Sequence, residues 1–219
     1  MTDDTRRVEL LDVFDEVGRH VGVKDRETVH RDGDWHRVFH CLVVAERPGT
    51  GAVAVLQLRG ATKAAFANML DLTAAGHLEA GESPLDGIRE LEEELGIHVD
   101  PADLVPLGTR RLIDESGEGR LNRELTHVYL LRDDRALIDY SPAAEEVDGL
   151  LDVPIDGLLN LFDRDGTLEV DGIVVASDGS TSSTRRTIGE ADLVPNRGYW
   201  VTLLVMAQRH LAGQQPLAI

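Results

Sequence analysis

The sequence predicts an α/β fold in which helices cover a mixed sheet. Apolar and β-branched residues dominate the runs at 37–45 and 52–59, which is the composition of buried strands. Residues 76–97 contain a turn followed by an amphipathic pattern of helical period. Apolar side chains recur at helical spacing at 199–211. Strands interleaved with helices in this way favour a sheet between helical layers.

Composition and charge restrict the class of protein. The chain has 219 residues, 42% hydrophobic and 28% charged, which is ordinary for one substantial globular domain. The net charge of −18 argues against nonspecific binding to nucleic acid or an anionic membrane, but bound metal ions would still admit a small phosphorylated substrate. We expect no membrane span, no signal peptide and a cytoplasmic location, where the single cysteine, Cys41, is a buried apolar residue.

The N-terminal part predicts a hairpin followed by a connection. Apolar residues at 8–14 and 21–23 flank a turn at 15–20, the pattern of two short paired strands. Residues 27–35 are polar and contain Gly33, so we interpret them as a connection.

The two strongly apolar runs are expected to be neighbouring strands. The turn between them, at 46–51, contains Pro48 and Gly49. An irregular or weakly helical loop at 61–70 and a short strand at 72–75 then lead into the amphipathic stretch.

Downstream, the pattern predicts two further strands and a second helix. The strands lie at 104–114 and 124–131, on either side of a turn at 115–120. Residues 145–153 lead into a helix at 155–162.

The C-terminal segment predicts less regular structure before a final helix. After a turn at 163–166, residues 167–176 alternate as in an extended segment or late hairpin, and residues 177–187 have the composition of a flexible loop. The helix at 199–211 is expected to bury one side, formed by Leu203, Leu204, Ala207 and Leu211.

The central helix has recognisable start and stop signals. Ser83 is a suitable N-cap, Pro84 suits the first helical position, and Asp86 at the third position favours the helix N-terminus. Gly96 is the expected stop.

One face of this helix gathers carboxylates. Glu90, Glu93 and Glu94 stand at i, i+3 and i+4, where side chains are neighbours and like charges destabilise a helix by roughly 0.2–0.5 kcal/mol per pair. A hard divalent cation would offset that repulsion, whereas the simpler alternative is a solvated acidic face. The opposite face is apolar and comprises Leu85, Ile88, Leu91 and Leu95.

The residues GHLEAGESPLDGIRELEEELGI at 76–97 resemble the Nudix hydrolase signature, which is G, five residues, E, seven residues, then REUxEExGU with U apolar. Here six residues separate Glu82 from Arg89, so the position of Glu82 is less closely defined. The resemblance implies an α/β/α sandwich with a mixed central sheet. We expect one domain over 1–219, comprising an N-terminal hairpin and connection at 1–36, a Nudix core at 37–162 and a C-terminal extension at 163–219 with the terminal helix.

The resemblance also implies the activity. Nudix hydrolases cleave diphosphate linkages. By this resemblance we expect hydrolysis of a nucleoside diphosphate derivative or related compound with Mg²⁺, or with Mn²⁺ in its place. Glu90, Glu93 and Glu94 are the implied metal ligands, and Glu90 is also a candidate to accept a proton from the attacking water. Arg89 is implied to orient the glutamates by charge-assisted hydrogen bonds.

Further ligands are implied outside the glutamate helix. Glu82 and the carbonyl of Gly76 match signature positions. Glu124 resembles a metal-binding glutamate of the branch that includes isopentenyl-diphosphate isomerase, and Glu145 and Glu146 compete with it.

The N-terminal part also resembles the N-terminal segment of proteins in the isopentenyl-diphosphate isomerase branch. The residues that carry this resemblance are RRVELLDVFDEVGRHVG and VHRDGDWHRVFH. The isomerase, however, uses a cysteine directly before a Gly-His pair, and here Ala75 stands before Gly76. Hydrolysis is therefore favoured, with an isomerase-like activity and a non-catalytic nucleotide-binding regulator as the alternatives. His30 and His36 lie where the isomerase has metal-binding histidines, although the spacing differs by about one residue.

Several other side chains have two interpretations each. His77 either touches substrate phosphate or structures the signature loop, and Trp35 either stacks on a base or packs in the core. His40 and His127 lie on predicted strands as ordinary core or face residues. The arginines at 110, 111, 185 and 186 receive no role. Apolar terminal segments make a homodimer a reasonable expectation.

Overall fold

The computed structural model describes residues 8–63, 65–117 and 120–219, and it forms two compact units. Residues 1–7, at the start of the predicted segment 1–36, and residues 118–119, in the predicted turn at 115–120, lie outside the described residues. Residues 8–39, 76–87 and the described part of 109–127 belong to what we call the N-terminal unit, and residues 40–75, 88–108 and 128–219 belong to the core unit. The single domain over 1–219 stays a prediction.

The predicted N-terminal hairpin is confirmed. Strand β1 (Leu10–Phe14) pairs antiparallel with β2 (His20–Asp25). The side chain of Asp15 closes the turn between them by accepting hydrogen bonds from the backbone amides of Val17 and Arg19.

The connection predicted at 27–35 contains a helix that the sequence did not predict, α1 (Arg26–Asp32). Asp25 caps this helix by accepting a hydrogen bond from the amide of Thr28 over 2.9 Å. Gly33 ends it in the left-handed conformation, with φ of 69°. The helix buries only Val29, so its composition carries little apolar signal.

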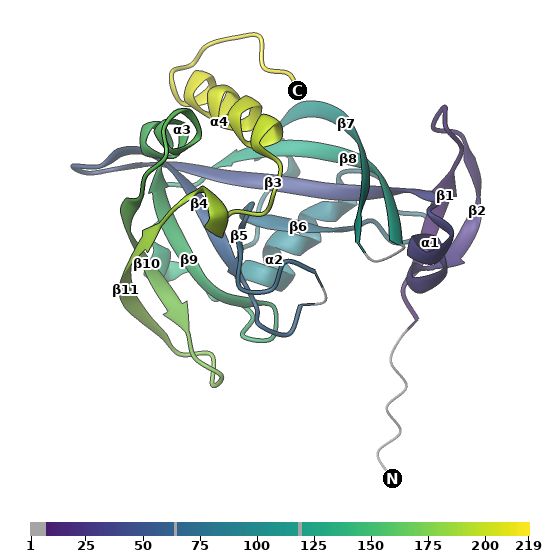
Figure 1. Ribbon diagram of the computed structural model, residues 1–219, viewed down its shortest axis with the longest axis horizontal. Coiled ribbons are helices and arrows are strands. Elements are labelled where there is room, and N and C mark those ends of the chain that lie inside the picture. Colours follow the sequence, from purple (N-terminus) through teal and green to yellow (C-terminus); the bar gives the residue numbers. More distant parts are fainter. Residues whose placement is uncertain (1–7, 64, 118–119) are drawn as a thin grey trace. The chain divides into compact units, whose positions relative to one another are not determined.

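The core unit contains the two strongly apolar strands, as expected. Strand β3 (Trp35–Arg47), which begins in the N-terminal unit, pairs antiparallel with β4 (Gly51–Arg59). From β4 the antiparallel order continues through β9 (Val147–Pro154), β10 (Leu168–Val175) and β11 (Thr181–Ile188) (Figure 1).

Two short elements replace the strand predicted at 72–75. Strand β5 (Leu70–Asp71) pairs with β4, and β6 (Ala74–His77) pairs with β3. Between them the hydroxyl of Thr73 donates to the carbonyl of Val55 and accepts a hydrogen bond from the amide of Val43. A side chain here makes the bonds that a backbone ladder would otherwise make, so the strand is interrupted.

The flexible loop predicted at 177–187 is also wrong, since β11 occupies most of it. Arg185 forms a two-pronged ion pair with Asp171 on the neighbouring strand β10, over 2.7 and 3.0 Å. Most side chains of β11 are exposed, so serine, threonine and arginine suit it as well as a loop.

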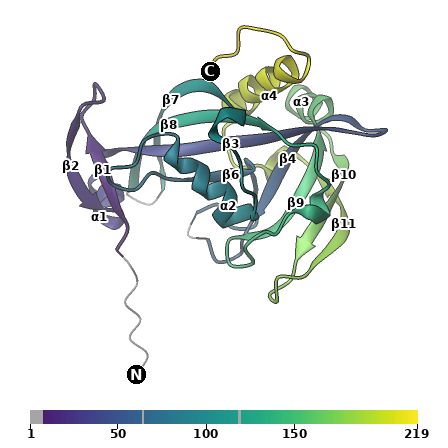
Figure 2. The same ribbon diagram turned by 180° about the vertical axis from the view of Figure 1, so that it is seen from behind.

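Helices cover both faces of the core-unit sheet. Helices α3 (Ile155–Asp163) and α4 (Arg197–Leu211) lie side by side on one face, where they pack on alternate residues of the strands, among them Leu42, Val44, Ala54 and Leu56 (Figure 1). Helix α2 (Arg89–Leu95) lies on the other face, which carries Gln57 of β4 and is best seen in the reverse view of Figure 2. The expected α/β/α layering is therefore present.

The remaining elements agree with the sequence. Strands β7 (Leu104–Gly117) and β8 (Arg120–Arg132) pair with each other at the predicted places. The predicted helices at 155–162 and 199–211 are α3 and α4, and α4 buries Leu203, Leu204 and Ala207. Short 3-10 turns lie at Pro101–Asp103, Leu137–Asp139 and Glu190–Asp192.

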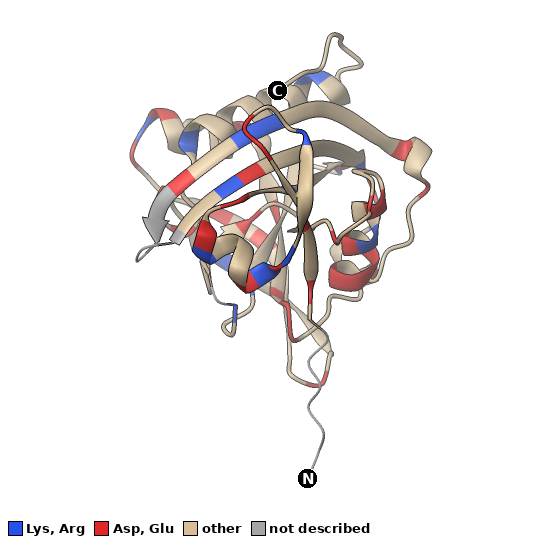
Figure 3. Ribbon diagram, turned by 90° about the vertical axis from the view of Figure 1, so that its right-hand side faces the viewer, with Lys and Arg blue, Asp and Glu red and all other residues tan. Residues whose placement is uncertain are grey.

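The charged residues are dispersed. Acidic and basic positions are scattered over helices, strands and loops alike (Figure 3). Within the described part of the chain, no helix has the length and hydrophobicity that a bilayer crossing requires.

Candidate active site on helix α2

The glutamate helix starts later than its sequence signals predict. The 3-10 turn η1 (Asp86–Ile88) precedes α2, whose N-cap is Ile88, so the assignments of Ser83 to the N-cap, Pro84 to the first helical position and Asp86 to the third are wrong. The carboxylate of Asp86 instead accepts a hydrogen bond from the amide of Ser83 over 2.6 Å and closes a turn. The predicted stop is confirmed, because Gly96 is left-handed with φ of 67°.

The acidic face of α2 is not simply solvated. Glu90 and Glu94 are only 9% and 4% exposed, whereas the Glu93 side chain is 59% exposed. Leu91 and Leu95 are buried on the apolar face. Carboxylates on an ordinary surface helix are mostly exposed, so this burial argues against a simply solvated acidic face.

Glu94 is held by three neighbouring groups in the core unit. Its Oε2 accepts hydrogen bonds from Nε2 of Gln57 at 3.2 Å and from the amide of Ala75 at 3.4 Å. Its Oε1 lies 3.6 Å from the ammonium of Lys63. Burial raises the pKa of Glu94, and the positive charge of Lys63 opposes that rise.

Arg89 joins the other two glutamates of the face. Its Nη1 donates to Glu90 over 2.6 Å and to Glu93 over 2.9 Å. Burial raises the pKa of Glu90 to about 7; Arg89 opposes this rise, and the negative charges of Glu94 and Glu93 add to it. The arrangement agrees with the orienting contacts predicted for Arg89.

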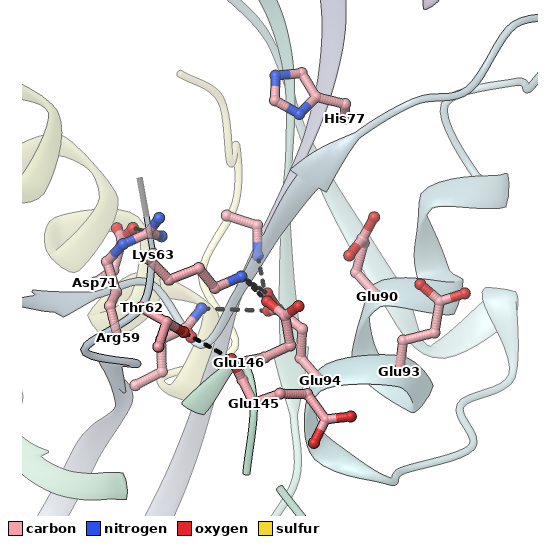
Figure 4. Close-up of polar contacts among 12 residues, drawn as sticks. Arg59, Thr62, Lys63, Asp71, His77, Glu90, Glu93, Glu94, Glu145 and Glu146 are labelled. Carbon is pink, nitrogen blue, oxygen red and sulfur yellow. Dashed lines mark hydrogen bonds and ion pairs between the residues drawn. The ribbon is translucent and has the colours of Figure 1, made fainter. Parts of the chain in front are cut away.

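A lysine that we did not single out from the sequence completes the surroundings of Glu94. The ammonium of Lys63 also forms an ion pair with Glu146, and Figure 4 shows the Lys63 side chain directed at both carboxylates. Next to it, Arg59 pairs with Asp71 over 2.9 Å. Glu146 was one of the carboxylates that competed for a place beside the signature glutamates.

The donor set of α2 fits a hard divalent cation. All of its side-chain donors are carboxylate oxygens, which Mg²⁺ and Mn²⁺ prefer. Burial raises the pKa of both Glu90 and Glu94 despite the nearby cationic side chains, and repulsion from Glu94 and Glu93 adds to the rise at Glu90. Additional positive charge between these carboxylates would favour their ionised forms.

The other predicted ligands belong to the N-terminal unit. Gly76 lies in strand β6. Oε2 of Glu82 accepts a hydrogen bond from the amide of Glu79 at 2.7 Å. Glu124 on β8 accepts from the side-chain amide of Asn122 at 2.6 Å.

Three histidines of the N-terminal unit come together. The candidate ligand nitrogens of His30, His36 and His77 all lie within 4.8 Å of one another, a spacing at which one metal ion could bind all three. Backbone carbonyls orient two of the rings, because Nδ1 of His30 lies 2.8 Å from the carbonyl of Arg26 and Nδ1 of His36 lies 3.0 Å from that of Asp34. Burial lowers the pKa of His36 to about 4, so this imidazole is neutral near pH 7.

His77 therefore lies beside His30 and His36, which neither of its two predicted roles, phosphate contact or loop structure, had indicated. Its ring centroid lies 5.1 Å from those of both His30 and His36. The sequence had indicated only the latter two as possible ligands.

Three other residues discussed in the sequence analysis, Trp35, His40 and Cys41, have ordinary packing or hydrogen-bonding roles. Trp35 is 4% exposed and packs in the core, with the Arg111 guanidinium 4.4 Å from its ring centroid. Nδ1 of His40 lies 2.9 Å from the hydroxyl of Tyr199. Cys41 is fully buried, as expected, and burial raises the pKa of its thiol above the usual range.

Nδ1 of His127 lies 3.1 Å from the hydroxyl of Thr109. This contact suits the ordinary strand residue expected at position 127.

Sequence reasoning missed two residues around Glu94. Gln57 is a polar residue within the apolar run at 52–59, and that interruption was a usable signal. Lys63 is one of only two lysines in the chain, but it lies in an irregular loop without a motif.

Comparison with known proteins agrees with this fold. The NUDIX domain family model matches residues 34–165. An uncharacterized Nudix hydrolase of Clostridium acetobutylicum is 36% identical over 199 residues, covering 90% of this chain and 95% of that protein. Nudix hydrolase 3 of Arabidopsis thaliana is 33% identical over 72% of this chain, which spans 21% of that longer protein.

A solved structure gives the same answer for the fold. The crystal structure of DR0079 from Deinococcus radiodurans superposes with a TM-score of 0.55 at 21% identity, covering 69% of this chain and 87% of that one. The fold and the sequence relatives define a hydrolase that acts on phosphoric anhydrides. The chain belongs to the Nudix hydrolase family.

Proposed function

We propose that the protein is a Mg²⁺-dependent hydrolase that cleaves the diphosphate linkage of a nucleoside diphosphate derivative or a related compound. The observation that carries the proposal is the burial of Glu90 and Glu94 on one face of α2, with Glu93 beside them. Family membership supports the reaction class.

In this proposal Glu90, Glu93 and Glu94 hold the divalent ion. When bound, the ion supplies positive charge that shields the phosphoryl oxygens and favours ionisation of a water. Gln57 and the amide of Ala75 keep the Glu94 carboxylate in place through its Oε2.

Arg89 and Glu90 have further roles. By donating to both Glu90 and Glu93, Arg89 limits their rotation and keeps the two carboxylates adjacent. Glu90, whose pKa is about 7 in the metal-free protein, is our candidate to accept a proton from the attacking water.

Gly76, Glu82, Glu124 and His77 remain candidates on the grounds of sequence. The first two match signature positions, Glu124 resembles a ligand of the isomerase branch, and His77 follows Gly76. Glu82→Gln, Glu124→Gln and His77→Gln test these side chains one at a time, with loss of Mn²⁺ affinity or of turnover as the expected result. The Gly76 carbonyl has no matching side-chain substitution, so electron density in a Mn²⁺-soaked crystal tests it.

The direct test is a screen of about a hundred diphosphate compounds for release of phosphate or nucleotide with Mg²⁺ or Mn²⁺. We expect turnover of at least one compound and complete loss with EDTA. Equal turnover with EDTA would contradict the metal proposal, and no turnover of any compound would contradict the hydrolase proposal.

The two alternatives predict different outcomes, which separate assays detect. A non-catalytic regulator would bind a nucleotide compound tightly and release no product over hours. An isomerase-like enzyme would incorporate deuterium from heavy water into isopentenyl diphosphate. The second result is not expected, because Ala75 has no proton to give and Cys41 is fully buried.

The three histidines favour a second metal site of different chemistry. Because the ligand nitrogens of His30, His36 and His77 lie within 4.8 Å of one another, we propose that this cluster binds a transition metal. Co²⁺, whose visible spectrum reports nitrogen ligation, is a suitable probe.

Two properties are proposed from the sequence alone. A homodimer is proposed from the apolar terminal segments, and analytical ultracentrifugation tests it. A cytoplasmic location is proposed from composition and the single cysteine, and cell fractionation tests it.

A further inference from the structure

Lys63 is placed between two carboxylates of the core unit. Its ammonium lies 3.6 Å from Oε1 of Glu94 and pairs more closely with Glu146 (Figure 4). The Lys63 side chain is 23% exposed, that of Glu94 is 5% exposed and that of Glu146 is 42% exposed. The lysine therefore joins a buried carboxylate to one that water reaches.

The backbone just before Lys63 is fixed to the segment that carries Glu146. The amide of Gly60 donates to the carbonyl of Glu146 over 2.9 Å, and the amide of Ala61 donates to the carboxylate of Asp148 over 3.1 Å. A Cβ at position 60 would lie 3.0 Å from that same carbonyl, so a side chain there would force the two segments apart. The reach of Lys63 to Glu94 is thus built into the fold.

The two oxygens of Glu94 have different partners. Oε2 takes the hydrogen bonds from Gln57 and Ala75, while Oε1 faces the ammonium. A divalent ion that uses Oε1 would compete with Lys63 for the same oxygen, because two cations at one carboxylate oxygen repel each other. Glu146 gives the lysine a second partner, so it can leave Glu94 and remain paired.

We propose that Lys63 is a built-in counter-ion that Glu94 and Glu146 share while no divalent cation is bound, and that it leaves Oε1 of Glu94 and pairs with Glu146 alone when the cation binds. Lys63 is then a positioning residue that sets the affinity of the site for the ion. This inference rests on the proposed function, since it takes Glu94 to be a metal ligand.

The scarcity of lysine makes the test specific. The chain has only two lysines, Lys24 and Lys63, so protein labelled with ¹³C in lysine alone gives two sets of side-chain NMR signals. Lys24 belongs to the N-terminal unit, pairs with Asp32 and Asp34, and serves as the internal reference. We expect Mg²⁺ to shift the Lys63 εCH₂ signal in a saturable manner and to leave that of Lys24 in place.

Calorimetric titration with Mn²⁺ gives an independent readout. Lys63→Met is expected to bind Mn²⁺ about fivefold more tightly than wild type, the factor that a modest ion pair represents. Arg164→Met removes one positive charge from the same unit at an exposed position and is expected to leave Mn²⁺ affinity unchanged. Lys63→Arg keeps the charge and should remain within about twofold of wild type.

The outcomes separate this inference from the proposed function. If Mn²⁺ binds wild type and Lys63→Met equally and the Lys63 signal does not move, the counter-ion role is wrong while the metal site stands. If Mn²⁺ binds neither protein, the metal site itself is wrong, and the inference is lost with it. Circular dichroism of each variant establishes that the comparison is between folded proteins.

Discussion

Gln57 on strand β4 donates a hydrogen bond to Glu94 on helix α2 over 3.2 Å, and both side chains are buried. We predict that Gln57→Leu, which keeps the volume but removes the donor, weakens Mn²⁺ binding about tenfold by leaving Oε2 without this support. It should also lower the free energy of unfolding by about 1–3 kcal/mol. Calorimetric titration and urea denaturation measure the two effects.

The control for this change is Gln214→Leu, an exposed position far along the chain. It should alter neither quantity. Unchanged Mn²⁺ affinity in Gln57→Leu would mean that the hydrogen bond does not position Glu94 for metal binding.

The signature glutamates can be tested against a neighbour on the same helix. Glu93→Gln and Glu94→Gln should each lower kcat at least about a hundredfold, because the neutral amide is a poor ligand for Mg²⁺. The fold should persist, as judged by circular dichroism. Glu92→Gln changes an exposed carboxylate of α2 and should retain wild-type kcat. Wild-type rates in both of the first two variants would remove the basis for the metal assignment.

Glu90 should make stability depend on pH in the metal-free protein. Burial raises its pKa from 4.5 to about 7, so the folded state holds this proton more tightly than the unfolded state. Its contribution is full below pH 4.5 and is lost as the pH rises through 7. Between pH 4.5 and a pH well above 7, the free energy of unfolding of wild type should therefore fall by on the order of 3 kcal/mol relative to that of Glu90→Gln.

Urea denaturation in EDTA at several pH values measures that difference. Comparison with Glu90→Gln cancels the groups that titrate in both proteins. A gap between the two proteins that stays constant from pH 4.5 to about 8 would show that Glu90 titrates normally.

The histidine cluster can be tested by comparing a substitution at a buried histidine of the cluster with one at an exposed histidine outside it. His36 is 1% exposed, and His36→Gln should weaken Co²⁺ binding at least tenfold and remove the visible band of nitrogen ligation. His98→Gln, whose side chain is 88% exposed, should leave both unchanged. An identical Co²⁺ spectrum in wild type and His36→Gln would rule out the cluster as the binding site.

Gly87 in the signature is predicted to matter for packing. A Cβ at this position would lie 2.5 Å from Cβ of Phe39, which cannot move aside because Phe39 is fully buried. Gly87→Ala should therefore lower the free energy of unfolding by about 1–3 kcal/mol. Gly198→Ala, at an exposed helical position with open space around it, should be neutral or slightly stabilising. Thermal unfolding of the two variants decides between these expectations.

The elements that sequence reasoning identified have strong local patterns. The apolar strands β3 and β4 and the helix α4 show their periodicity within a few residues. Helix α1 and strand β11 were missed because each is mostly exposed and polar. Their stability comes from caps and pairing partners, which are distant or subtle in the sequence.

The start of α2 shows how tertiary contacts can override a local signal. Ser83, Pro84 and Asp86 form a favourable helix start in sequence, yet Asp86 closes a turn on Ser83 and α2 begins at Arg89. The close approach of Gly87 to Phe39 of β3 accompanies this change. Capping preferences contribute only about 1 kcal/mol, so packing can displace a helix end by a turn or more.

By itself, the sequence determined the family, the layered fold and the gathering of three glutamates on one helical face, because these depend on a contiguous motif and on local periodicity. Only the tertiary structure decided that two of the glutamates are buried, that Gln57 and Lys63 contact Glu94, and that His77 joins His30 and His36. Burial and charge pairing depend on segments far apart in the chain, and no local spacing encodes those distances.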